Sequence, residues 1–167
     1  MGVFDLPKAG PTEFKPNRNS WDVEFPLHDK HVSVSFYLDD TREMTAELLA
    51  RVEKFTAGLE HFDHVARDLI RQDYARGDKS KSREYLIHHL ERFDADTRLE
   101  IFGTDDVDAA GVDHLLAGLA LFQVSLDPES SQSMAGFDYI LGSGITDYIL
   151  CIRFNGNGEA TGLYWES

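Results

Sequence analysis

A long stripe of apolar residues at helical spacing dominates the centre of this chain. The stripe residues recur at alternating intervals of four and three, which places them on one face of an α-helix. They are Leu48, Val52, Phe55, Leu59, Phe62, Ala66 and Leu69. The spacing predicts one helix from about residue 42 to residue 75, capped by Thr41 or a nearby aspartate whose side chain accepts from first-turn amides. Such a helix buries its apolar face against another layer of the fold.

Shorter helices are predicted after this one. Gly77 and the polar residues behind it end the first helix, and Ser82 starts a second one in REYLIHHLERF. A short helix is expected over residues 96–102, ending at Gly103, and Asp108 is placed to cap another through VDHLL. The middle of the chain is therefore a helical block.

Both ends of the chain alternate apolar and polar residues, which is the pattern of half-buried strands. WDVEFPL and HVSVSFYL predict an N-terminal hairpin. From Leu119 onward, GLALFQVSLDP, GFDYILG, DYILCIRF and TGLYWES predict four more strands, the last two joined by a tight turn at residues 155–158. Because strands and helices are segregated, we predict an α+β fold. Its mainly antiparallel sheet combines the N-terminal hairpin with a C-terminal four-strand meander, and the central helical block packs on one face.

The length of 167 residues and the hydrophobic content of 42% predict one globular domain. We expect residues 21–167 to form it. Residues 1–20 contain Pro7, Pro11 and Pro16 and little periodicity, so we expect them to be extended or poorly ordered. No Gly-rich phosphate loop lies between a strand and a helix, which argues against a nucleotide-binding doubly wound fold.

The sequence predicts a cytoplasmic protein that does not enter membranes. It has no run of about 18 apolar residues, and MGVFDLPKAG lacks the basic region and apolar core of a secretory signal. Cys151 is the single cysteine, so an internal disulfide and a multi-cysteine zinc site are both excluded. Its apolar neighbours indicate a buried thiol with a packing role.

The charge of the chain is strongly negative and unevenly distributed. With 16 Lys plus Arg against 30 Asp plus Glu, the formal charge of −14 repels nucleic acids and anionic lipids. Residues 42–92 hold ten basic and ten acidic residues, whereas residues 94–147 hold eleven acids and one base, Arg98. Such a span serves either as a solvated face or as an acidic surface that docks a basic protein. The candidate binding residues are Asp105, Asp106, Asp108, Asp138 and Asp147.

FDYILGSGITDYIL contains DYIL twice, beginning at Asp138 and at Asp147. The alternation predicts two antiparallel strands that turn about Ser143. That turn would bring Tyr139 level with Asp147 or Tyr148. The two aspartates would then either bond to the Gly-Ser-Gly backbone of their own hairpin or face a pocket that a ligand enters.

The C-terminal pattern also resembles a known family. A strand ending in LDP, then FDYILGSGITDYILCIRFNGNGE, then a strand finishing at Glu166-Ser167, is similar to a family of uncharacterised, mostly bacterial cytoplasmic proteins called domain of unknown function two thousand and four. The similarity is best over residues 119–167 and looser over the helices and first hairpin. It implies an α+β cytoplasmic domain without an established activity, so it transfers no catalytic residues.

One cluster on the long helix suggests metal chemistry instead. His64 lies four residues after Glu60 and three after His61, hence beside both on a helix surface, and all three are ligand types for a divalent metal. A helix-bundle site needs matching ligands from other helices, and these residues flank the apolar stripe. The flanking positions therefore favour a solvated, ion-paired face over a metal site.

The leading functional hypothesis is therefore a non-enzymatic, acidic interaction protein without cofactor, which binds a basic protein as an immunity, antitoxin-like or regulatory protein. The alternative is a metal-binding protein or metal-dependent hydrolase that uses Glu60, His61 and His64. A small-molecule sensor with an aromatic pocket is a third class, compatible with Trp21, Tyr139, Tyr148 and Trp165. Formation of a homo-oligomer is compatible with each of these.

Overall fold

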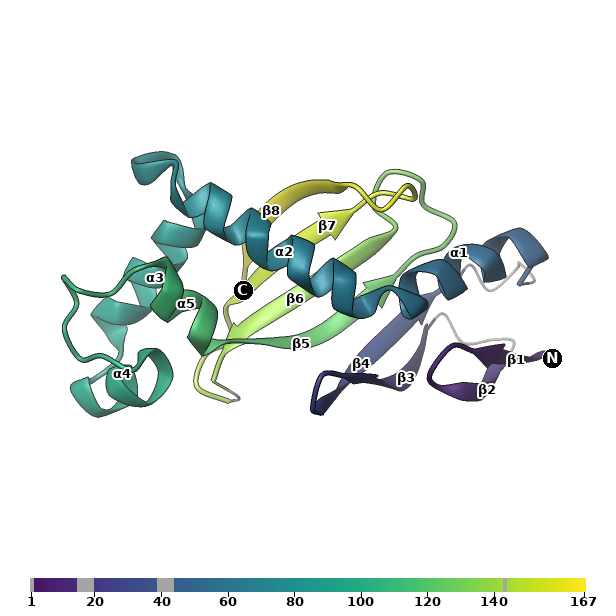
Figure 1. Cartoon of the computed structure of the whole chain (residues 1–167), viewed down its shortest axis with the longest axis horizontal. Coiled ribbons are helices and arrows are strands. Elements are labelled where there is room, and N and C mark those ends of the chain that lie inside the picture. Colours follow the sequence, from purple (N-terminus) through teal and green to yellow (C-terminus); the bar gives the residue numbers. More distant parts are fainter. Residues whose placement is uncertain (1, 15–19, 39–43, 143) are drawn as a thin grey trace.

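The chain forms strands towards both ends and helices between them (Figure 1). The computed structural model describes residues 2–14, 20–38, 44–142 and 144–167. The elements in chain order are β1 (Gly2–Leu6), β2 (Gly10–Phe14), β3 (Ser20–Leu27), β4 (Lys30–Tyr37), α1 (Ala46–Ala57), α2 (Leu59–Tyr74), the short 3₁₀ helix η1 (Gly77–Lys79), α3 (Lys81–Arg92), α4 (Ala95–Phe102), α5 (Val112–Gly118), β5 (Leu119–Leu126), β6 (Ala135–Leu141), β7 (Ile149–Phe154) and β8 (Ala160–Glu166). Within the described residues, no helix has both the length and the apolar character needed to cross a bilayer.

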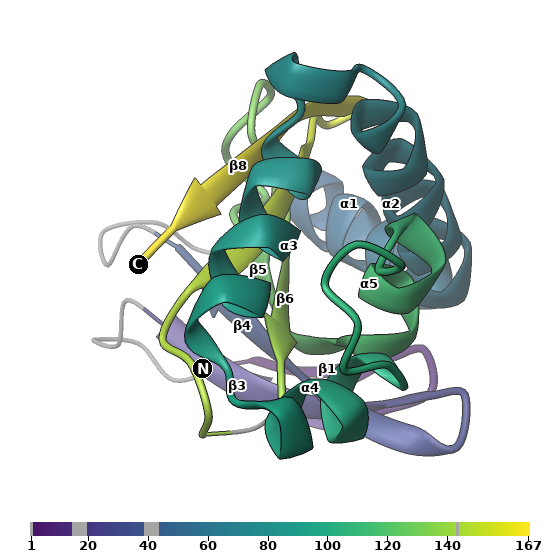
Figure 2. The same cartoon turned by 90° about the vertical axis from the view of Figure 1, so that its left-hand side faces the viewer.

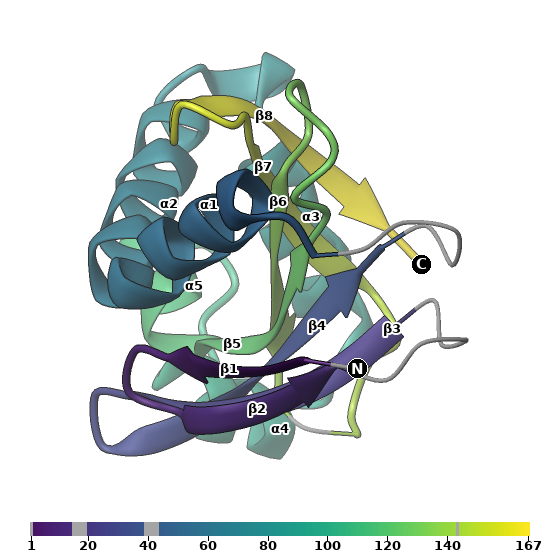
Figure 3. The same cartoon turned by 90° about the vertical axis from the view of Figure 1, so that its right-hand side faces the viewer.

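The N-terminal hairpin and the C-terminal meander join in one six-stranded sheet. Its strand order is β3-β4-β5-β6-β7-β8. All neighbouring strands are antiparallel except β4 and β5, which run parallel, with Val34 level with Val124. A parallel pair needs a long crossover, and the helical block supplies it. Figures 2 and 3 show α1 and α2 along one face of this sheet. The predicted α+β fold, with a mainly antiparallel sheet and helices on one side, is confirmed.

The core lies between the apolar stripe and the helix-facing side of the sheet. Phe62 of α2 is its centre: its ring stacks on Phe55 at 4.5 Å between centroids, makes an edge contact with Phe154 at 5.4 Å and lies tilted to Phe137 at 6.3 Å. Aromatic side chains of this size contribute much of the buried apolar area that drives folding. The stripe is therefore the helical half of the core, as its spacing predicts.

The prediction of one continuous helix is wrong at Gly58. There α1 ends, and α2 begins at the next residue. A side chain at Gly58 would place its Cβ 3.1 Å from the Phe62 ring, so glycine allows the close approach at the break. The helix also starts later than predicted, with Thr45 as N-cap accepting from the Leu48 amide. The predicted cap, Thr41, lies outside the described residues.

Two other helix starts differ from the predictions. Helix α3 is capped by Ser80, two residues before the predicted start, and the Ser80 hydroxyl accepts from the Arg83 amide. Helix α5 begins after Gly111 and not at Asp108, and the Gly111 amide donates to His114 Nδ1. The predicted end of α4 is confirmed, since Gly103 has a φ of 72° that favours glycine.

The N-terminal segment is more regular than the prolines suggest. Residues 2–14 form the hairpin of β1 and β2, beside α1 and the β3–β4 hairpin (Figure 3). Leu6 enters the core with 1% of its surface exposed, and Lys8 Nζ lies 3.3 Å from the Glu60 carboxylate of α2. Ordered structure therefore begins well before Trp21. Residues 15–19 lie outside the described part of the chain.

Candidate functional site

The most acidic part of the molecule is one end of it, where α4, the loop of residues 103–111 and α5 lie together, away from α1 (Figure 1). We call the exposed carboxylates of this region the acidic corner. Its members are Asp94, Asp96, Glu100, Asp105, Asp106, Asp108 and Asp113. The three loop aspartates among the predicted binding residues therefore belong to a larger exposed group.

Some of these carboxylates are occupied by local contacts. Asp94 caps α4 by accepting from the Thr97 amide at 2.8 Å, and this hydrogen bond lowers the pKa of Asp94 below its usual value. Asp106 accepts from the amides of Asp108 and Ala109, which shapes the loop. Asp113 pairs with Arg71 of α2.

The other carboxylates of the acidic corner have no counter-charge. Within the described residues, no ion pair forms at Asp96, Glu100, Asp105 or Asp108. Arg98 is the only base of the span, and its guanidinium is turned to the carbonyls of Leu90 and Phe93 at the end of α3. The charge of Arg98 helps to lower the pKa of Asp94, but within the part of the chain that the structure describes Arg98 forms no ion pair with a carboxylate of the acidic corner.

Large apolar side chains are exposed among these charges. Leu99 of α4 is 56% exposed and Val107 of the loop is 42% exposed. Gly142, the residue after β6, lies against α4, because a Cβ added there would fall 2.7 Å from the Ile101 side chain. Ile145 and Asp147, which precede β7, are both exposed. The end of the molecule therefore combines unpaired carboxylates with apolar contact area.

Asp138 lies in a different place from Asp147. In the observed register Asp138 is level with Cys151 and Tyr139 with Leu150, so the predicted register, with Tyr139 level with Asp147 or Tyr148, is wrong. Ser143, the predicted centre of the turn, lies outside the described residues. Strand β6 ends at Leu141 and β7 begins at Ile149, and Asp147 precedes Cys151 by four residues. The two aspartates of the repeated motif are not brought together.

Asp138 instead faces a hollow on the side of the sheet opposite α1 and α2. The hollow has a volume of about 540 Å³, and Ser125 and Arg153 also line it. Burial raises the pKa of Asp138, although a hydrogen bond with Cys151 and the charge of Arg153 act against the rise. Burial also raises the pKa of the Cys151 thiol, so the cysteine is a protonated packing group.

The predicted metal ligands do not converge. Glu60 reaches Lys8, His64 Nε2 lies 3.4 Å from Asp68, and His61 is exposed beside the Phe62 ring. Within the described residues, no group of three His, Cys, Asp or Glu side chains is close enough to hold a metal ion. The metal site stays a prediction, which metal analysis of protein purified without a histidine tag tests.

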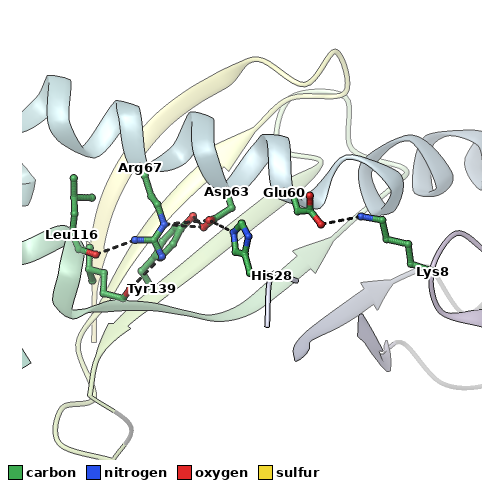
Figure 4. A network of polar contacts seen from close by, with 8 residues as sticks. Lys8, His28, Glu60, Asp63, Arg67, Leu116 and Tyr139 are labelled. Carbon is green, nitrogen blue, oxygen red and sulfur yellow. Dashed lines mark hydrogen bonds and ion pairs between the residues drawn. The ribbon is translucent and has the colours of Figure 1, made fainter. Parts of the chain in front are cut away.

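A buried polar network lies beside this surface cluster, and sequence reasoning missed it (Figure 4). Asp63 of α2 is only 4% exposed. It accepts from the Tyr139 hydroxyl at 2.7 Å and from Arg67 Nε at 3.2 Å, and His28 Nε2 lies 3.4 Å away. Burial raises the pKa of Tyr139 well above its usual value, and the neighbouring Asp63 charge adds to the rise. The spacing of Asp63 from Ala66 and Ile70, which puts all three on one helix face, is the signal that could have indicated its burial.

Arg67 ties this network to the start of β5. Its guanidinium donates to the carbonyls of Leu116 at 3.0 Å and Leu119 at 3.2 Å, and it lies 5.3 Å from the centre of the Tyr139 ring. A buried carboxylate held by an arginine and a hydroxyl is well satisfied, and removing one partner is costly. The network therefore fixes α2, β6 and the α5–β5 junction to one another.

The chain was compared with known protein families, curated proteins and solved structures. No protein-family model matches the chain, and no curated protein or solved structure matches it significantly. The functional argument therefore depends on the surfaces and cavities described above.

Proposed function

We propose that this protein is a non-enzymatic interaction protein whose acidic corner docks a basic protein partner. The observation that carries the proposal is the combination of exposed carboxylates without counter-charge and exposed Leu99 and Val107 at one end of the molecule. An immunity or antitoxin-like protein that masks a cationic toxin has this character, and so does a regulatory protein with a basic target. The cytoplasmic location and the family resemblance stay predictions.

The two kinds of side chain have different physical roles in such docking. The carboxylates attract a basic surface over roughly 10 Å, the screening length at about 0.1 M salt, and so raise the rate of encounter. The apolar side chains supply contact area from which water is removed, and this area slows dissociation. Carboxylates without apolar contact area would bind many different basic molecules, each of them weakly. A partner with apolar side chains among its basic residues is therefore the expected occupant.

Site-specific photo-crosslinking tests this proposal in the cell of origin. A photoreactive amino acid replaces Val107 in the acidic corner, and in a second variant it replaces Thr161, an exposed residue of β8. We expect Val107 to crosslink to one protein with a basic surface, and Thr161 to crosslink to it much less. Equal crosslinking from both positions, or a partner with an acidic surface, would overturn the proposal.

A charge-neutral variant then tests which residues bind the captured partner. The change of Asp105, Asp106 and Asp108 to Asn keeps an acceptor oxygen at position 106, so the local turn is preserved while three charges are removed. The matched control changes three exposed acids elsewhere, in the substitutions Asp5→Asn, Glu24→Gln and Glu159→Gln. Only the first variant should bind the purified partner more weakly, and equal losses in both would show an effect of net charge alone.

A further inference from the structure

A cavity of about 290 Å³ lies beside the Asp63 network, on the helix side of the sheet. Its walls are the β3–β4 turn at residues 28–31, the α2 residues Asp63 and Arg67, and residues 117–121 at the α5–β5 junction. Figure 4 shows His28 and Arg67 on either side of the Asp63 carboxylate. The cavity is separate from the acidic corner and from the hollow at Asp138.

At this cavity Arg67 and Lys30 have N–H groups that no acceptor in the part of the chain described by the structure uses. Both oxygens of Asp63 already accept from Arg67, and one of them also accepts from Tyr139. Arg67 has five N–H groups and donates three of them, at Nε, Nη1 and Nη2, which leaves two. Within the described residues, Lys30 has no ion pair or hydrogen bond with another side chain. Asp29 is the only other carboxylate of the lining.

The turn that carries His28 is held in an uncommon backbone conformation. His28 has a φ of 54°, in the left-handed region that a residue with a side chain rarely adopts. Its Nε2 is directed to Asp63, and its ring is otherwise exposed. Local strain of this kind persists where the surrounding contacts fix the residue, and here it holds the imidazole at the cavity wall.

The rest of the lining is apolar and the volume is small. Leu27 and Val32 of the hairpin and Leu119 and Leu121 of β5 contribute hydrocarbon surface. Cavities of drug-sized ligands begin at about 300 Å³, so this one fits only a small molecule. We propose that the cavity binds a small organic anion, whose carboxylate or phosphate group accepts from Arg67 and Lys30 while a short carbon chain packs against the leucines.

Backbone-amide NMR titration of the full chain tests the site with three probes: inorganic phosphate, butyrate and butylamine. Butyrate and butylamine have similar carbon chains and opposite charges. We expect saturable shifts at residues 28–31 and 117–121 with phosphate or butyrate, and none with butylamine. Phosphate alone would identify a phosphate ligand, whereas butyrate alone would identify a carboxylate with a carbon chain. Failure of both anions to cause saturable shifts at about 10 mM, or equal shifts with butylamine, would overturn the proposal.

Substitutions next to the β3–β4 turn distinguish anion binding in the cavity from nonspecific attraction to basic side chains. Lys30→Ala with His31→Ala removes an exposed lysine and an exposed histidine at the cavity, and Lys79→Ala with His61→Ala removes the same two residue types elsewhere. We expect the first pair to weaken anion binding about tenfold and the second to leave it unchanged. Unchanged binding in the first pair would overturn the site. The Asn variant of the acidic corner should bind these anions normally, so this proposal and the proposed function fail independently.

Discussion

The buried position of His89 predicts that the free energy of unfolding depends on pH. The residue lies on the inner side of α3 and is only 1% exposed. Its Nδ1 is 2.7 Å from the Tyr85 carbonyl and its Nε2 is 3.0 Å from the Thr146 hydroxyl. A carbonyl only accepts, so Nδ1 carries the proton and donates, and Nε2 of the neutral ring accepts from Thr146. Burial is the main reason that the pKa of His89 falls from the ordinary 6.5 to about 4.

The sign and size of the effect follow from proton linkage. Between about pH 4 and pH 6.5 the unfolded chain binds a proton at His89 and the folded chain does not, so acidification favours unfolding. The stability contributed by the neutral His89 ring is fully present above pH 6.5 and is lost as the pH falls towards 4. From the two pKa values, the loss in free energy of unfolding is about 2 kcal/mol at pH 5 and about 3 kcal/mol at pH 4.

Urea unfolding at pH 7, 6, 5 and 4 measures this loss in the natural protein and in His89→Gln. The Gln amide can still donate to one neighbour and accept from the other, but it does not titrate. We expect the variant to be less stable at pH 7 because of its changed shape, and to lose about 3 kcal/mol less than the natural protein on going to pH 4. His61→Gln, at an exposed ring, should follow the natural protein. If the free energy of unfolding falls with pH equally in His89→Gln and in the natural protein, His89 is not a buried neutral imidazole.

Two other substitutions test buried carboxylates by chemical unfolding. Tyr139→Phe removes the hydroxyl that donates to Asp63 and should lower the free energy of unfolding by about 1–3 kcal/mol, whereas Tyr164→Phe, at a 47% exposed ring, should change it by less than about 0.5 kcal/mol. Equal effects would contradict the buried network. Asp73 is buried, which raises its pKa, but hydrogen bonds, first from the Ser82 amide, outweigh burial and lower the pKa below the ordinary 3.8. Asp73→Asn should therefore cost about 2 kcal/mol at pH 7, and the difference should shrink as the pH falls below 3.8; a constant difference would contradict the assignment.

The local patterns of the sequence predicted most elements because each is set by neighbouring residues. Alternation located β5 to β8, and the apolar stripe located the helix face that forms the core. The break at Gly58 was missed because Phe55, Leu59 and Phe62 keep the helical spacing across it. Spacing along the sequence reports which side of a helix is buried, and it does not report where the axis bends.

The remaining features depend on contacts between distant parts of the chain. The parallel pairing of β4 with β5 joins residues that the whole helical block separates, and no local pattern specifies it. Asp63 is buried because Tyr139 donates to it from 76 residues away. The sequence predicts the acidic corner as a stretch of charge, but only the fold shows that Arg98 donates to the carbonyls of Leu90 and Phe93 and that Leu99 is exposed within the corner.

The most direct test of the acidic corner is the association rate of the partner captured from position 107. Stopped-flow mixing at low and at high salt compares the natural protein, the variant with Asn at positions 105, 106 and 108, and the control variant with three other acids changed. We predict that the Asn variant associates about tenfold or more slowly at low salt, and that this difference disappears at high salt because ions screen the charges. Equal association rates for the Asn variant and the control variant at low salt would contradict docking at the acidic corner.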